Sequence, residues 1–192
     1  LGARVHGGGF YPEEYPSLCE FDLDGICSRG RIENRHGYFC RGMFWGVEYY
    51  MKKAPGVLAV ESGYIGGKVE DPSYEEVCEG NTGHVEAVRV LFDISKTDYE
   101  TLAKLFFEIH DPTQKDHQGP DYGEQYRSEI FYNSPEQKAV AEKLIQELKV
   151  KGYAVVTRLA PATTFWVAED YHQNYYTRKG TLPYCHGYTR RF

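Results

Sequence analysis

The stretch HVEAVRVLF, residues 84–92, carries the clearest structural signal in the chain. Successive side chains of a β-strand point to opposite faces, so every second residue of this stretch shares a face. One face holds Val85, Ala87, Arg89 and Leu91, and the other holds His84, Glu86, Val88, Val90 and Phe92. The alternation predicts a strand in a packed sheet, with one carboxyl group, Glu86, on an otherwise apolar face.

Patterns on both sides of this stretch predict the other elements. We expect strands over 38–40, 57–65, 128–132 and 154–158, and helices over 44–53 and after the capping patterns at 97–100 and 134–137. The element order predicts an α+β fold, a two-layer sandwich in which helices pack on one face of a mixed β-sheet. A long coil C-terminal tail follows.

The length of 192 residues is that of one domain. Glycine and proline interrupt any regular pattern near the start, so residues 1–36 are expected to be an N-terminal extension of unassigned role, and 37–192 the domain. Two long loops, 68–83 and 110–126, separate the expected elements. Loops of more than about 12–15 residues in compact domains are often functional.

Composition excludes several classes of protein. The net charge of −6 and the lack of a basic patch predict no nucleic-acid partner, and no apolar run is long enough to span a membrane. Five cysteines, scattered and odd in number, predict a reducing and therefore cytoplasmic setting, although a removed signal peptide remains compatible with the sequence. With no pair of closely spaced cysteines, we expect no structural metal site.

The segment GMFWG, residues 42–46, lies between an expected strand end and a helix start. A helix N-terminus stabilises a thiolate, yet the residue in the turn is Met43, whose thioether has no ionisable proton. The pattern alone leaves a second interpretation open, in which Met43, Phe44 and Trp45 are core residues.

The carboxyl of Glu86 has two interpretations as well. On a buried apolar face it would tend to keep its proton and could donate it to a developing oxyanion. Near the start of the strand it could instead face solvent, where a glutamate costs little. Tyr74, Asp121 and Tyr126 lie in the two long loops, and pattern alone does not distinguish them from exposed turn residues.

A series of ordered motifs resembles the peptide methionine sulfoxide reductases of the A type, which act on the S epimer. That family carries Gly-Cys-Phe-Trp-Gly after a strand, where this chain has GMFWG at 42–46. The resemblance covers about residues 37–187 and continues through PGV at 55–57, GYIGG at 63–67, PSYEEVC at 72–78, TGHVEAV at 82–88, HDPT at 110–113, QGPDYGEQYRS at 118–128, AEDYHQ at 168–173 and YC at 184–185.

The resemblance implies thiol-dependent reduction of methionine S-sulfoxide in proteins and peptides, a protein-repair activity. Met43 matches the position of the nucleophilic cysteine, or of the selenocysteine found in some members. Glu86 matches the acid, Tyr74 and Tyr126 the two phenols that bind the sulfoxide oxygen, and Asp121 a carboxylate that orders the site.

The remaining matches concern substrate binding and regeneration. Phe44 and Trp45 match the aromatic wall that holds the substrate's S-methyl group. Cys185 matches the resolving cysteine, whose disulfide thioredoxin or another dithiol would open. Oxidised methionine and such a reductant are therefore the implied partners, and the implied chemistry needs no metal or organic cofactor.

Met43 departs from the family pattern. It stands for a substituted cysteine or selenocysteine, or for a natural loss of the nucleophile. With Met at this position we predict an inactive chain. The alternative function is a non-catalytic module that binds methionine sulfoxide.

Overall fold

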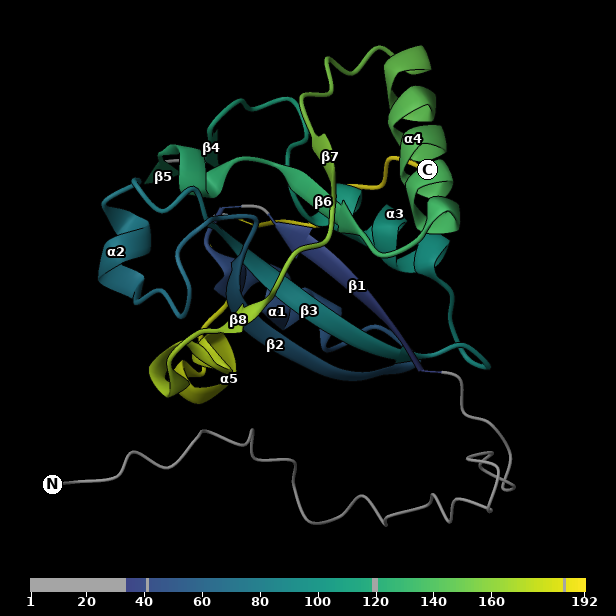
Figure 1. Cartoon of the computed structure of the whole chain (residues 1–192). Helices are drawn as coiled ribbons and strands as arrows, with labels where there is room; N and C mark the ends of the chain where they lie inside the picture. The colour runs from purple at the N-terminus through teal and green to yellow at the C-terminus, as the bar shows by residue number, and fades with distance from the viewer. Residues whose placement is uncertain (1–33, 41, 119–120, 185) are drawn as a thin grey trace, which may run out of the picture. The chain divides into compact units, whose positions relative to one another are not determined.

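The computed structural model describes residues 34–40, 42–118, 121–184 and 186–192 (Figure 1). Its main sheet has six strands in the order β7-β6-β1-β3-β2-β8. All neighbouring pairs are antiparallel except the parallel pair β6–β7, so the sheet is mixed. The strands are β1 Asn34–Cys40, β2 Val57–Ile65, β3 Val85–Asp93, β6 Glu129–Tyr132, β7 Arg158–Pro161 and β8 Trp166–Val167.

Five helices and a small ribbon complete the described part of the chain. The helices are α1 Phe44–Met51, α2 Tyr74–Cys78, α3 Tyr99–Ile109, α4 Pro135–Val150 and α5 Tyr175–Lys179. The ribbon pairs β4 His117–Gln118 with β5 Asp121–Tyr122. Single 3₁₀ turns span Glu124–Tyr126 and Asp170–His172.

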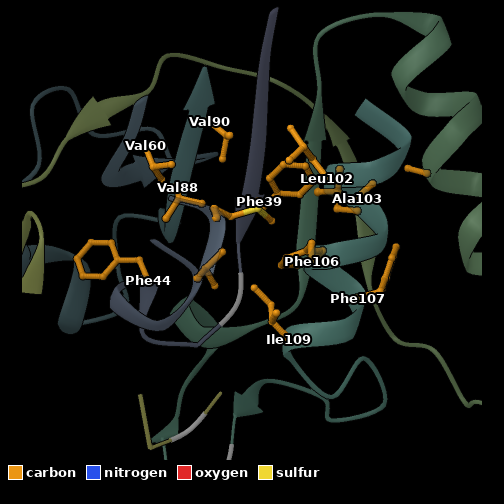
Figure 2. Packing of buried hydrophobic residues seen from close by; sticks show 14 of the residues in the cluster. Phe39, Phe44, Val60, Val88, Val90, Leu102, Ala103, Phe106, Phe107 and Ile109 are labelled. Atoms are coloured by element: carbon orange, nitrogen blue, oxygen red, sulfur yellow. The ribbon is translucent and has the colours of Figure 1, made fainter. Parts of the chain in front are cut away.

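One face of the sheet packs against α1, α3 and α4. The alternation predicted for β3 places Val88 and Val90 on this face, where they share an apolar cluster with Phe39 of β1 and with Leu102 and Phe106 of α3 (Figure 2). Helices α3 and α4 lie side by side (Figure 1). This layer arrangement confirms the predicted α+β class.

The opposite face of the sheet carries a smaller apolar cluster and no helix takes part in it among the described residues. Its buried members are Cys40, Ile65, Val85, Ala87 and Phe131. The connection between β7 and β8 covers them, through Ala162 and Phe165. Residues of opposite parity along β1 and β3 therefore belong to different layers, as the period of two requires.

Two helix starts were predicted from their caps. Ser134 accepts a hydrogen bond from the Gln137 N–H at the start of α4, as expected. At α3 the cap is Asp98, which accepts from the Thr101 N–H at 2.7 Å, so the predicted capping box at 97–100 was one residue early. The apolar stripe of α3 still faces the core.

Several sequence-based boundaries were wrong: β1 starts four residues before the predicted strand 38–40, α1 ends at Met51 and not at 53, and the predicted loop 110–126 contains β4, β5 and a 3₁₀ turn. The strand predicted over 154–158 begins only at Arg158, because the Val156 N–H donates to the Pro112 carbonyl in a loop and not to a strand. The loop 68–83 contains α2, opened by a capping box between Ser73 and Glu76. The tail contains β8 and α5 and is not coil throughout. Of the extension predicted over 1–36, residues 1–33 lie outside the described residues, and residues 34–36 are the first residues of β1.

Candidate functional site

The junction between β1 and α1 forms the centre of the candidate site. Gly42 has φ +52°, a left-handed conformation that favours glycine, and its N–H donates to the Tyr126 carbonyl at 3.3 Å. A Cβ at Gly42 would also lie 2.7 Å from the Cβ of Gln118. Met43 then caps α1 in an extended conformation and is partly exposed. The chain thus turns sharply and presents residue 43 at the helix N-terminus.

Glu86 lies directly beside this turn. Its side chain is 1% exposed, and its Oε2 accepts a hydrogen bond from the Phe44 N–H at 3.1 Å. The solvent-facing interpretation of Glu86 was therefore wrong, because α1 packs against this part of β3. The hydrogen bond from the Phe44 N–H therefore holds the buried Glu86 carboxyl next to residue 43.

Phe44 and Trp45 form an aromatic wall with rings from the C-terminal region. The Phe44 ring is buried, 5.0 Å from the His172 ring centre. Trp45 is half-buried and stacks on Tyr175 with ring centres 3.6 Å apart, while its Nε1–H donates to His172 Nδ1 at 3.0 Å. The core interpretation therefore holds for Phe44, whereas Met43 and Trp45 are both partly open to solvent.

His172 holds this wall as a neutral ring. Its Nδ1 accepts from Trp45, which requires that nitrogen to be unprotonated. Burial lowers the pKa of His172 below its ordinary value, against the opposing effect of the nearby carboxylates Glu169 and Glu75. Sequence reasoning missed this residue as part of the site, although it stands in the AEDYHQ motif beside two acidic residues.

Tyr74 and Tyr126 come from different loops, and Tyr74 lies near enough to both Tyr126 and Glu86 to interact with them electrostatically. Tyr74 begins α2, and its ring centre lies 4.5 Å from that of His172. Burial raises the pKa of Tyr74, and a hydrogen bond with Cys78 and the nearby groups Glu86 and Tyr126 raise it further. The Tyr74 phenol consequently keeps its proton at neutral pH and can act as a hydrogen-bond donor.

Glu169 links β2, α2 and the C-terminal region. Its carboxylate accepts from the Tyr64 OH at 2.8 Å and from the Tyr74 N–H at 2.9 Å. Burial works to raise the pKa of Glu169, but the hydrogen bonds from its own N–H, from the Tyr74 N–H and from Tyr64 outweigh it and lower the pKa. An ionised Glu169 fixes the start of α2. No sequence pattern distinguished Glu169 from the other acidic residues of the C-terminal region.

Two predicted site residues fall outside what the structure describes, namely Cys185 and the side chain of Asp121. The neighbours of Cys185 nevertheless contact the α1 turn. The Tyr184 OH donates to Met43 Sδ at 3.7 Å, and the His186 ring packs so closely on Gly46 that a Cβ there would overlap it. The chain on both sides of position 185 therefore lies against the turn that presents Met43.

Two other cysteines are located by the structure. Cys40 is fully buried in the cluster on the helix-free face of the sheet, and its Sγ donates to the Arg127 carbonyl at 3.4 Å. Glu86 and Val88 share the parity of the opposite face, so β1 and β3 separate Cys40 from the Glu86 carboxyl. Cys78 is an exposed free thiol at the end of α2, and partial burial raises its pKa.

Within the described residues, no cluster of three or more His, Cys, Asp or Glu side chains is arranged to hold a metal ion. A search of the same residues for a helix of sufficient length and hydropathy to cross a membrane also finds none.

The fold and this cluster define an α+β protein that holds a buried carboxyl at a helix N-terminal turn, bordered by aromatic rings. A family model described as peptide methionine sulfoxide reductase matches residues 35–191. The chain is 51% identical to the peptide methionine sulfoxide reductase MsrA of Methanosarcina mazei over 147 residues. This alignment covers 75% of this chain and 70% of the Methanosarcina protein.

Solved structures agree with this match. Mxr1 from Saccharomyces cerevisiae in its reduced form superposes with a TM-score of 0.75 at 28% identity, covering 92% of this chain and 98% of that one. Mxr1 in complex with Trx2 shares the fold with a TM-score of 0.55 at 22% identity, covering 90% and 96%. The chain belongs to the peptide methionine sulfoxide reductase family.

Proposed function

We propose that this protein reduces methionine S-sulfoxide in peptides and proteins when residue 43 carries a thiol or selenol. The observation that carries the proposal is the hydrogen bond from the Phe44 N–H to Glu86 Oε2. It joins the residue following position 43 to a buried carboxyl, so a nucleophile at 43 and a proton donor would share one small volume.

The chemistry is an oxygen transfer from substrate sulfur to protein sulfur. A thiolate at position 43 attacks the sulfoxide sulfur, and Glu86 supplies the proton that the sulfoxide oxygen needs. The S–O bond of the substrate breaks, methionine leaves, and residue 43 becomes a sulfenic acid. The substrate is reduced by two electrons and the sulfur of residue 43 is oxidised by two.

The neighbouring side chains have defined roles in this proposal. The protonated phenols of Tyr74 and Tyr126 donate to the sulfoxide oxygen, and Asp121 helps to order the loop that carries Tyr126. Phe44 and Trp45 hold the S-methyl group, since sulfur–aromatic contacts are favourable by roughly 0.3–1.5 kcal/mol. The neutral His172 fixes the Trp45 indole through its Nδ1.

Regeneration requires a second sulfur. We assign it to Cys185, whose thiol attacks the sulfenic acid, forms a disulfide with residue 43 and releases water. The contacts of Tyr184 with Met43 and of His186 with Gly46 support this assignment. A dithiol reductant then opens the disulfide; the yeast relative Mxr1 has been captured with Trx2, which supports a thioredoxin as the partner.

We assign the nucleophile to position 43 and not to Cys40 or Cys78. Cys40 lies buried on the far side of the sheet from Glu86. The raised pKa of Cys78 disfavours its thiolate. The thioether of Met43 cannot form a thiolate, so the chain with Met at this position is inactive by this proposal.

The test compares the chain with its Met43→Cys variant, using methionine S-sulfoxide and dithiothreitol. We expect turnover only in the variant, and none with the R epimer. Turnover by the Met43 chain, or failure of a folded Met43→Cys variant to release methionine, would contradict the proposal. Binding of the S-sulfoxide without turnover by both proteins would favour the alternative, a sulfoxide-binding module.

A further inference from the structure

One carboxylate joins the strand pair that carries Glu86 to the helix that carries Tyr74. The Oε2 atom of Glu169 accepts a hydrogen bond from the Tyr64 OH at 2.8 Å, and its Oε1 atom accepts one from the Tyr74 N–H at 2.9 Å. Each oxygen therefore serves a different element, β2 in one case and α2 in the other. We call this pair of bonds the Glu169 bridge.

The β2 end of the bridge stands beside the buried acid. Tyr64 of β2 pairs directly opposite Glu86 of β3 in the antiparallel register, and both side chains are buried. Side chains of directly opposite residues lie on the same face of a sheet, with Cβ atoms about 4.5–5.5 Å apart. A group that bonds to the Tyr64 OH is therefore held in a fixed relation to the strand pair that carries Glu86.

The backbone around Glu169 is attached to the same sheet. Strand β8 ends at Val167, two residues earlier, and pairs with β2. The Ala168 N–H continues this attachment by donating to the Ser62 carbonyl at 2.9 Å. The Glu169 side chain thus extends from a fixed backbone toward α2.

Helix α2 depends on contacts outside itself for its position. It has five residues, whereas isolated helices shorter than about 12–15 residues are marginal in water. Its capping box between Ser73 and Glu76 is local, and Val77 anchors it to the apolar cluster. Tyr74 is the first residue of α2, so its N–H has no acceptor within the helix, and Glu169 supplies one. The bridge therefore holds the backbone of the residue that carries the phenol.

In the proposed function, two groups from different elements have to converge on one atom. The Tyr74 phenol donates to the same sulfoxide oxygen that Glu86 protonates. Strand pairing on both sides fixes the backbone of Glu86, whereas Tyr74 lies on a short helix within a long loop. Catalysis is sensitive to such placement, since a misplacement of about 1 Å can cost roughly 100-fold in rate.

We propose that Glu169 is a positioning residue for oxygen recognition: its bridge holds the Tyr74 phenol at the distance from Glu86 at which both groups reach the sulfoxide oxygen. The inference rests on the proposed function, because it acts through that oxygen. Glu169 itself donates no proton and takes no part in the oxygen transfer.

Loss of the bridge should slow methionine release through Tyr74 alone. In the Met43→Cys background we expect Glu169→Ala to slow the first methionine release by roughly threefold to fivefold, because the phenol is displaced but still present. Glu169→Gln keeps an oxygen that accepts from the Tyr74 N–H and an amide group that can donate to the Tyr64 oxygen. This conservative variant should therefore retain most of the rate.

The experiment is a double-mutant cycle in full-length proteins that all carry Met43→Cys. Its four members are the parent, Glu169→Ala, Tyr74→Phe and the combination of the two. The rate of the first methionine release is measured at saturating methionine S-sulfoxide, well below the lowest Tm. In the Tyr74→Phe background no phenol oxygen remains to be positioned, so adding Glu169→Ala should change the rate by less than about twofold. Two residues that act through one interaction give such non-additive effects.

Gln173→Ala is the matched control from the same segment. The Gln173 side chain bonds to the Ser62 backbone and to the Ala168 carbonyl, so its loss should lower Tm but keep the rate of methionine release. Hydrogen exchange of the peptide 73–79, measured in the chain with Met43, is a readout independent of turnover. It should become faster in Glu169→Ala and stay near the parent in Glu169→Gln and Gln173→Ala.

The inference and the proposed function fail in different ways. Absence of methionine release from a folded Met43→Cys parent overturns the proposed function, and this inference with it. Normal release in the parent overturns the inference alone if Glu169→Ala leaves the rate unchanged, or slows it by the same factor in both backgrounds of the cycle.

Three further results would also overturn the inference. They are an unchanged rate in Tyr74→Phe, an equal loss of rate in Gln173→Ala, and unchanged hydrogen exchange of 73–79 in Glu169→Ala. If Glu169→Ala does not fold, Glu169→Asp takes its place in the cycle with the same expected outcome, because its side chain keeps the charge but is one methylene too short to reach both partners.

Discussion

The two halves of the candidate site are held in place by different kinds of hydrogen bond. Position 43 directly precedes α1 and position 86 belongs to β3, and the helical bonds and strand ladders of these elements fix the main chain there. The ladder of β3 with β1 and β2 runs along almost its whole length. Substituting a side chain there leaves these bonds in place, so the geometry of the first half survives changes in its chemistry.

The C-terminal half has few regular elements and depends on polar side chains that bond to backbone. Gln173 accepts from the Ser62 N–H at 3.0 Å and donates to the Ser62 and Ala168 carbonyls at 2.9 Å each. Glu48 accepts from the Asn174 N–H at 2.9 Å. Single substitutions in this half should therefore disturb structure, whereas substitutions in the first half should disturb the reaction.

The largest effect is expected at Glu86. In the Met43→Cys background, Glu86→Gln removes the proton donor but leaves an oxygen to accept the Phe44 N–H. Since general-acid catalysis is worth roughly 100-fold to 10,000-fold, kcat should fall by about that factor. Glu61→Gln, on the neighbouring strand β2, is the control and should keep kcat near that of the parent. An unchanged rate in Glu86→Gln would remove this residue from the mechanism.

Gln173→Ala should mainly cost stability. It deletes three hydrogen bonds and removes the acceptor of the Ser62 N–H, while the Ser62 carbonyl keeps its bond from the Ala168 N–H. The expected loss is about 1–3 kcal/mol of unfolding free energy. At roughly 2–4 °C per kcal/mol, thermal unfolding should show a Tm several degrees lower.

The exposed Gln146 on α4 offers a matched control for that measurement. Gln146→Ala removes the same side chain from a helix surface, where alanine is tolerated best, and should leave Tm nearly unchanged. Equal Tm values for the two variants would contradict the idea that side-chain bonds hold the C-terminal half together.

The same contrast explains what the sequence could and could not predict. The alternation of 84–92 predicted β3 because periodicity reports backbone packing directly, and the strand expected over 57–65 coincides with β2. Gln173, Glu169 and His172 escaped prediction because their bonding partners lie about 100 or more residues away, at Ser62, Tyr64 and Trp45. Short elements such as α2 and β8 lie below the length at which periodicity is visible.

The site itself divides in the same way. A carboxyl on an otherwise apolar strand face singled out Glu86 as a candidate site residue, and the structure shows that its side chain is buried. The hydrogen bond that Glu86 accepts from the Phe44 N–H joins residues far apart in the chain, and no local sequence pattern predicts such a contact. The roles of Tyr74 and Tyr126 came from family resemblance alone, since loop tyrosines carry no positional signal.

A smaller effect on catalysis is expected at Tyr74. In the Met43→Cys background, Tyr74→Phe removes one donor to the sulfoxide oxygen and should lower kcat by roughly fivefold to tenfold, the value of one hydrogen bond. Tyr64→Phe removes the OH that donates a hydrogen bond to Glu169. It should lower Tm and change kcat less than Tyr74→Phe does. A larger kcat loss in Tyr64→Phe than in Tyr74→Phe would reverse this assignment.

The smallest effect concerns pH. The pKa of His172 is lower in the folded protein than its ordinary value of 6.5, mainly because of burial. Between these two pKa values the unfolded chain binds a proton that the folded protein does not, so unfolding free energy should decrease as pH falls below about 6.5. His172→Gln should flatten this decrease. Denaturant unfolding at several pH values measures both, and an equal slope in the two proteins would show that His172 is not its source.

The most direct measurement of the central claim is to trap the first intermediate. The double variant Met43→Cys, Cys185→Ser is given one equivalent of methionine S-sulfoxide in the presence of dimedone, which labels sulfenic acids, and is then mapped by mass spectrometry. The account predicts one label, on residue 43, and no label with the R epimer. A label on Cys40 or Cys78, with residue 43 unmodified, would contradict it.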